Sequence, residues 1–249
     1  MIPAWLGFFD ALLALALVGA GIIAAHFDLT PPFVGFQMFA FGFLLSIFGT
    51  IVGIIGIIRT GNPARRSGRN RAVAATVISL AIALPVIALV AGSRHYPPIN
   101  DITTDFDNPP EFVFAETLAP NSGRDMKYDQ AKYEERQKYG YPAPLTPLKM
   151  DSDPAATFEK VKEAAVQMPD WQITSTDPKE MTIEGVSRSK LFHFVDDFVI
   201  QVRPADGGGS LVEMRSKSRV GVGDFGVNYN RIESFFARLK GTGVATGAS

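Results

Sequence analysis

The sequence predicts an α-helical membrane anchor with three transmembrane helices, followed by an α+β soluble domain with the order helix, four-stranded antiparallel sheet, helix. Three observations support this prediction. Three long apolar runs fill the N-terminal region, the composition changes abruptly near residue 95, and apolar residues recur at helix and strand spacings from residue 152 onward. We expect four parts: a three-span anchor at 1–94, a proline- and tyrosine-rich arm at 95–150 that packs on the domain, the extracytoplasmic domain at 151–241 and a flexible tail at 242–249.

Each apolar run is long enough to cross a bilayer, which takes about 20 helical residues. The runs cover residues 4–25, 33–58 and 72–92. The first has no basic flank and a second span follows it closely, so we interpret it as an anchor rather than a cleaved signal. The loop RTGNPARRSGRNR after the second span contains five arginines and no acid, which predicts a cytoplasmic position. We therefore expect a cytoplasmic N-terminus and an extracytoplasmic C-terminal domain. In a bacterium with two membranes, this means an inner-membrane anchor and a periplasmic domain.

Small residues recur along one face of the second span, at spacings of four and three. They are Gly42, Ser46, Gly49, Gly53 and Gly56. Small side chains allow helices to approach closely in lipid. This helix-packing face serves either the packing of the first two spans or contact with another membrane protein. Asp10 in the first span either reaches the cytoplasmic interface, pairs with an arginine of the basic loop or takes part in a proton relay.

The arm at residues 96–149 contains eight prolines and five of the six tyrosines. The prolines disfavour regular helices and central strands, whereas disordered chains are poor in aromatic residues. We expect an extended, packed arm with one helix at about 126–137. Asp101, Asp105 and Asp107 are either calcium ligands or turn residues. They match no EF-hand spacing, and Asp-Asn-Pro-Pro favours turns, so no metal is expected.

The folded domain begins with DPAATFEKVKEAAVQM, which predicts a helix with Asp153 as N-cap and Pro154 at its first position. Turn signals then separate four strand-like runs. We expect strands at 171–175, 181–194, 198–203 and 211–220, with Asp196 and Asp197 in the tight turn between the second and third, and a closing helix at about 228–240.

The spacing Gly221-x-Gly223-x-x-Gly226 before the closing helix raises the question of a dinucleotide site. That fingerprint needs a second parallel strand after the helix, and only GTGVATGAS remains here. We interpret the stretch as a strand-to-helix turn in which Asp224 or Asn228 caps helix amides. No cofactor is therefore expected.

Alternation along SLVEMRSKSRVG places Glu213, Arg215, Lys217 and Arg219 on one face of the last strand. Arg188 and Arg203 extend this basic patch. Two interpretations remain. In the first, the arginines form structural ion pairs with nearby aspartates. In the second, they hold an anionic group such as a lipid headgroup or a partner's carboxylate, and an open groove lined by Phe192, Phe198 and Ile200 would favour this ligand-binding alternative.

Other classes of function are poorly supported. Residues 95–249 carry 18 basic and 23 acidic side chains, which argues against nucleic acid as a partner. The chain has no cysteine, which removes disulfides and thiolate chemistry. The three histidines are far apart in sequence, and no nucleophile elbow, zincin motif or P-loop occurs. No catalytic residue is therefore assigned.

The motifs YPPINDITTD, NPPEF, FVDDFVIQVRP and RSKSRVGVGDFGVNYNRI resemble the bacterial domain-of-unknown-function family numbered 1499, over roughly residues 96–241. Its members commonly bear N-terminal spans, and the resemblance implies no established reaction. The family pattern has an Asp pair before a strand, then Arg-Ser-x-Ser-Arg-x-Gly, Asp-x-Gly-x-Asn and a helical Arg. Gln201 departs from it, because the family often has Arg there. The pattern falls on Asp196, Asp197, Arg215, Ser216, Ser218, Arg219, Gly221, Asp224, Gly226, Asn228 and Arg231.

We expect a non-enzymatic binding or envelope-assembly protein. The alternatives are a lipid- or small-anion-binding domain that uses the sheet cleft and basic patch, and a hydrolase of unknown type. The expected partners are the membrane, a membrane or periplasmic protein, and a lipid or anionic ligand. The candidate cluster, whether for binding or for structural ion pairs, comprises Arg215, Ser216, Ser218, Arg219, Asp224, Asn228, Arg231, Asp196, Asp197, Arg188 and Arg203.

Overall fold

A computed structural model describes residues 2–61 and 67–241 of the chain. Its contacts separate a helical unit, made mainly of residues up to Ser93, from a second unit that begins at Arg94. The predicted tail at 242–249 lies outside the described residues, as do Arg65 and Arg66 of the basic loop.

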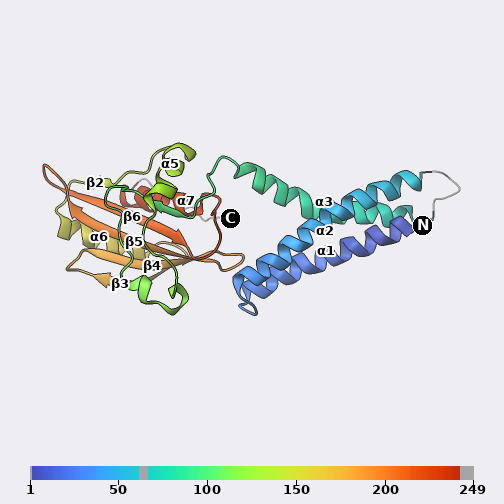
Figure 1. Ribbon diagram of the computed structural model, residues 1–249, viewed down its shortest axis with the longest axis horizontal. Coiled ribbons are helices and arrows are strands. Elements are labelled where there is room, and N and C mark those ends of the chain that lie inside the picture. Colours follow the sequence, from blue (N-terminus) through green and yellow to red (C-terminus); the bar gives the residue numbers. More distant parts are fainter. Residues whose placement is uncertain (1, 62–66, 242–249) are drawn as a thin grey trace. The chain divides into compact units, whose positions relative to one another are not determined.

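The helical unit consists of three long apolar helices (Figure 1). They are α1 (Ile2–His26), α2 (Pro32–Arg59) and α3 (Arg69–Gly92). All three are long and apolar enough to cross a membrane. Their bounds lie within three residues of the predicted spans, so this part of the predicted fold class is confirmed.

The small residues of α2 lie at helix contacts inside this unit. Gly42, Ser46, Gly49, Gly53 and Gly56 are all buried. A Cβ atom at Gly42 would lie 2.9 Å from the carbonyl oxygen of Ala14 on α1, and one at Gly56 would lie 2.9 Å from the Cβ of Ala72 on α3. The face therefore packs against both other helices of the same chain.

The pair Gly21 and Gly19 on α1 provides a matched test of this packing. A Cβ at Gly21 would lie 2.5 Å from the carbonyl oxygen of Gly35, whereas a Cβ at Gly19 has no neighbour within 4 Å. Alanine normally stabilises a helix interior relative to glycine by about 1 kcal/mol. We expect Gly19→Ala to leave the thermal transition in detergent unchanged or raised, and Gly21→Ala to lower it. Equal transitions for the two variants would contradict close backbone packing at Gly21.

The second unit is built on an antiparallel sheet, with two helices on one face and the proline-rich arm on the other. The elements after α3 are β1 (Asp101–Thr103), α4 (Phe114–Thr117), the 3-10 helix η2 (Ala119–Asn121), α5 (Gln130–Gly140), β2 (Leu148–Met150), α6 (Pro154–Val166), β3 (Trp171–Asp177), β4 (Thr182–Arg188), β5 (Val195–Pro204), β6 (Ser210–Ser218) and α7 (Val227–Leu239). Asp153 caps α6 as predicted, because its Oδ1 accepts a hydrogen bond of 3.0 Å from the Ala156 amide.

The sheet has six strands, so the prediction of four was wrong. The strand order is β1-β6-β5-β4-β3, and β2 also pairs with β6. Asp101 lies opposite Lys217, and Leu148 lies opposite Val212. The two additional strands have three residues each and lie in the proline-rich arm, where alternation gives no signal. They pair with backbone groups of β6 that would otherwise form an open edge.

The predicted tight turn at Asp196 and Asp197 was also wrong, because both residues lie inside β5. Asp196 is opposite Ser187 of β4, and Asp197 is opposite Val186. Successive strand residues point to opposite faces. The two carboxylates therefore lie on opposite faces of the sheet.

Both faces of the sheet are covered. On one face, Phe198, Ile200 and Met214 are fully buried against α6 and α7, and the ring of Trp171 lies 4.1 Å from that of Phe198. On the other face, Val199 packs with residues of the arm, which are Phe112, Ala115 and Met126. Phe198 and Ile200 thus fill the core instead of lining an open groove.

Candidate functional site

The charged side chains of β6 lie on the face that the arm covers. Alternation places Glu213, Arg215, Lys217 and Arg219 on this face, beside Val199 and Asp197 of β5. We call the ion pairs and hydrogen bonds on this face, both within the sheet and between sheet and arm, the arm-side network. The network includes Asp101, Arg124, Glu184, Asp197, Arg203, Glu213, Arg215, Lys217 and Arg219.

The innermost ion pair joins Asp101 of β1 to Arg215 of β6. Arg215 Nε and Nη2 donate to the two carboxylate oxygens of Asp101 at 2.9 and 2.8 Å. Lys217 Nζ donates to Asp101 Oδ2 at 2.8 Å. The side chains of Asp101 and Arg215 are 0% and 1% exposed. Such a buried carboxylate requires cations that are held in fixed positions.

The arm accepts two further hydrogen bonds from Arg215. Its Nη2 also donates to the carbonyl oxygen of Met126 at 2.9 Å, and its Nη1 donates to that of Pro110 at 3.4 Å. The guanidinium carbon lies 4.8 Å from the ring centroid of Phe112 and 5.3 Å from that of Tyr128. Arginine suits this position because its planar fork binds a carboxylate with two nitrogens while aromatic rings cover its faces.

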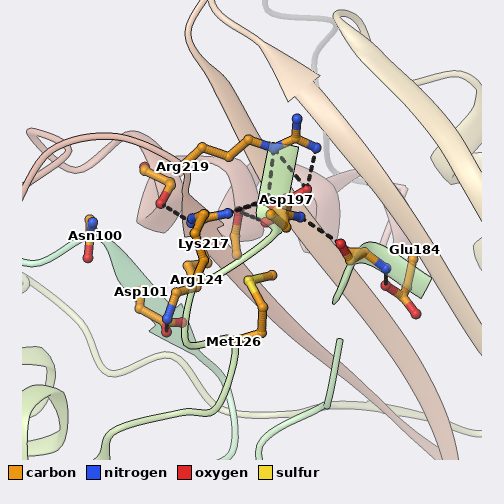
Figure 2. Close-up of polar contacts among 12 residues, drawn as sticks. Asn100, Asp101, Arg124, Met126, Glu184, Asp197, Lys217 and Arg219 are labelled. Carbon is orange, nitrogen blue, oxygen red and sulfur yellow. Dashed lines mark hydrogen bonds and ion pairs between the residues drawn. The ribbon is translucent and has the colours of Figure 1, made fainter. Parts of the chain in front are cut away.

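A second ion pair centres on Asp197, toward which Arg219 and Arg124 point in Figure 2. Arg219 Nη2 donates to Asp197 Oδ1 at 2.7 Å, and Arg124 Nη1 donates to Oδ2 at 3.1 Å. Arg124 belongs to the arm, and its Nη2 donates to the carbonyl oxygen of Ser218 at 2.8 Å. This pair therefore connects the arm to two strands of the sheet.

Glu184 of β4 is a network residue that the sequence did not reveal. Its carboxylate accepts hydrogen bonds from the amides of Val113, Phe114 and Ala115, at 3.0, 2.7 and 2.8 Å. These amides lie at the N-terminus of α4 and have no acceptor within the helix. A negative charge at this position is therefore favourable. The strand register places Glu184 opposite Val199 on this face, but no local sequence pattern points to donors 70 positions away.

Glu213 is buried beside Arg203 in an environment that disfavours its charged form. Arg203 Nε lies 3.1 Å from Glu213 Oε2, while Arg203 Nη2 donates to Gln201 Oε1 at 2.8 Å. Burial raises the pKa of Glu213 to about 7, although Arg203 opposes the shift, and Asp105 raises the pKa further. Arg188, by contrast, ends β4 with an exposed side chain.

The remaining predicted residues lie on the opposite face, against α7. Arg231 Nη2 donates to Asp196 Oδ2 at 2.6 Å, and Arg231 Nη1 donates to Ser216 Oγ at 2.8 Å. Asn228 accepts a hydrogen bond from Ser216 Oγ at 2.7 Å and donates to Ser218 Oγ at 2.9 Å. We call these contacts the helix-side network. The residues of the predicted cluster therefore lie on both faces of the sheet, in two separate networks.

Asp224 forms no ion pair that the structure records and acts instead on the start of α7. Its Oδ1 accepts from the Gly226 amide at 2.9 Å, and its Oδ2 accepts from the Asn228 amide at 2.8 Å. Burial raises the pKa of Asp224, and these amide hydrogen bonds oppose the shift. This geometry is that of a capping residue in a strand-to-helix turn.

Chemically, both networks join layers of the domain. Asp196 and Asp197 point to opposite faces, so they do not form a carboxylate pair that could act on one substrate. Over residues 2–61 and 67–241, no three His, Asp or Glu side chains are grouped as metal ligands. A groove on the surface is lined by residues such as Leu145, Glu233, Phe236 and Lys240, none of which belongs to either network.

The family comparison covers the whole of this unit from its first strand to its last helix. A family model described as a protein of unknown function, DUF1499, matches residues 101–239. The chain belongs to the DUF1499 family. The match begins at the first residue of β1 and ends at the last residue of α7, so residues 101–150 of the arm are part of the DUF1499 domain. Comparison with curated proteins and with solved structures gave no match.

The first prediction from the site concerns Asp101. Asp101→Asn leaves Arg215 and Lys217 buried without their carboxylate, which costs about 3–5 kcal/mol. We expect the thermal transition of the DUF1499 domain to fall by roughly 10 °C. Trp171 fluorescence reports on this transition, in a Trp5→Phe background. Glu134→Gln, which removes an exposed pair with Lys138, is the control and should change little. A similar small change for Asp101→Asn would contradict a structural role for the pair.

The stability of the domain should depend on pH through Glu213. The raised pKa of Glu213 means that the folded domain retains a proton which the unfolded chain releases above about pH 4.5. This contribution to stability is present at low pH and is lost as the pH rises through about 7. Between pH 5 and pH 8 it amounts to about 2 kcal/mol. Thermal unfolding of Glu213→Gln should therefore show a gain over the parent protein that grows from pH 5 to pH 8. A pH-independent difference would disprove the assignment.

Proposed function

We propose that this protein is a non-enzymatic binding or assembly module of the bacterial envelope, with its DUF1499 domain in the periplasm and its three helices in the inner membrane. The observation that carries the proposal is the internal pairing of the cations on the arm-side face. Arg215, Lys217 and Arg219 each contact a buried carboxylate of the same domain. The groups that would give an enzyme or an anion site its chemistry are thus engaged in holding the fold.

The lipid- or anion-binding alternative faces an energetic obstacle. A phosphate or carboxylate ligand would have to displace Asp101 from Arg215, whose side chain is 1% exposed. The displaced aspartate would then remain buried without its cations, which is strongly unfavourable. A partner that meets the outer surface of the domain avoids this cost, so we favour a protein partner over an anion on the basic face.

The proposed orientation rests on the arginines between the second and third helices. Arg59 ends α2, and Arg69 and Arg71 lie in the first turn of α3. Positive residues in short loops remain on the cytoplasmic side. After one further span the chain is on the opposite side, where the domain begins at Arg94.

The proposal is tested first by location and then by partner. A reporter enzyme that is active only in the periplasm should be active when fused after Asn100 and silent when fused after Arg66, and the reverse pattern would invert the topology. The full chain is then extracted gently from native membrane and the co-purifying material is identified by mass spectrometry. A stoichiometric protein supports the binding module. A stoichiometric anionic lipid, lost on Arg219→Ala without a change in stability, would overturn it in favour of the lipid-binding alternative.

A further inference from the structure

The loop between β6 and α7 exposes more large apolar surface than a soluble loop normally does. We call residues 220–227 the apolar loop, which includes Val227, the first residue of α7. Val220, Val222, Phe225 and Val227 are 44%, 84%, 62% and 47% exposed. Single exposed apolar side chains are ordinary, but a group of four in eight residues marks an interaction surface.

The apolar loop is held in a fixed shape that directs these side chains outward. Phe225 has a φ of 55°, in the left-handed region that a bulky residue rarely adopts. The Asp224 amide donates to the carbonyl oxygen of Ile99 at 3.1 Å, and Asn100 Nδ2 donates to that of Gly221 at 2.5 Å. The Asp224 carboxylate also accepts from the amides of Gly226 and Asn228 at the start of α7, so these bonds fix both ends of the loop. Its exposed side chains are therefore presented by an ordered backbone.

The residues that hold the apolar loop are those that follow the last span. A Cβ at Gly226 would lie 2.7 Å from ring atoms of Tyr96, and a Cβ at Gly223 would lie 3.1 Å from the Cα of Pro98. Only three residues separate Tyr96 from Gly92, the last residue of α3. Four extended peptide units reach at most about 14 Å. Chain length alone therefore keeps the apolar loop near the point where the chain leaves the bilayer.

The opposite end of the sheet has a different surface. The β5–β6 turn contains Asp206 followed by three glycines, and the β3–β4 turn exposes Lys179 and Glu180. The sheet register places these turns at the end away from Ser187, Asp196 and Ser218, whereas only one residue separates the apolar loop from Ser218. The exposed apolar residues of the apolar loop thus lie at the end where the membrane tether enters.

We propose that the apolar loop inserts into the interface between headgroups and acyl chains of the same bilayer that α3 crosses. Valine and phenylalanine gain from this boundary, and the nearby Tyr96 is of the type enriched there. The insertion gives the DUF1499 domain a second attachment to the membrane and so restricts its rotation on the tether. The inserted loop requires only that the three helices cross a membrane. It does not depend on the orientation of the chain or on the partner named in the proposed function.

The absence of cysteine from the chain allows a site-specific test. Val222→Cys in the apolar loop and Lys179→Cys at the far end of the sheet are labelled with an environment-sensitive fluorophore. Val222 is 84% exposed as a residue and the Lys179 side chain is 90% exposed, so the two positions form a matched pair. The full chain is placed in nanodiscs of phosphatidylethanolamine and phosphatidylglycerol that contain no other protein.

We expect the label at position 222 to emit at shorter wavelength and to be quenched several-fold more strongly by nitroxide-labelled lipids than the label at position 179. Equal, water-like emission at both positions would overturn the proposal. The same holds if the label at 222 is water-like in nanodiscs and shielded only in native membranes, which would indicate a protein partner. An unchanged Trp171 thermal transition in both labelled variants establishes that the domain is folded. The fluorescence result does not depend on whether the domain is periplasmic or cytoplasmic. A negative result would therefore leave the proposed function unaffected.

Discussion

The burial of Asp101 against Arg215 is the constraint on which the architecture of the DUF1499 domain depends. A carboxylate with no exposure is tolerated only when cations and donors surround it. Arg215 supplies two hydrogen bonds to it and Lys217 a third, from the adjacent strand. Arg215 is in turn shielded by Phe112 and Tyr128 of the arm. A sheet face that carries this many charges can be buried only because the arm brings their partners.

The same logic explains the sequence pattern that resembles the family. Along Arg-Ser-x-Ser-Arg, the arginines at 215 and 219 point to the arm, whereas Ser216 and Ser218 point to Asn228 of α7. The adjacent acids of β5 divide in the same way, Asp197 toward the arm and Asp196 toward Arg231. The motif therefore reflects one central strand pair that bonds to two layers at once. A motif of this kind specifies a fold without specifying a reaction.

The sequence predicted what is local or periodic and missed what depends on distant pairing. The spans, the cap at Asp153 and the alternation of β6 followed from spacing alone. Asp105 makes the expected turn, because its Oδ1 accepts from the amides of Asp107 and Asn108. Asp101 was grouped with it as a turn residue, yet it pairs with a residue 114 positions away. The two short arm strands and the capping role of Glu184 were missed for the same reason, since their partners are set by tertiary contacts.

The central claim is that the arm, β6 and the core form one cooperative unit, closed by the buried charges. Native-state hydrogen exchange measures this most directly. The amides of Thr104 and Met214, which link the arm to β6 at 3.0 and 2.9 Å, should exchange with the same opening free energy as the core amides of β5. If the arm amides exchange much faster than those of β5, the arm opens independently and the account is contradicted.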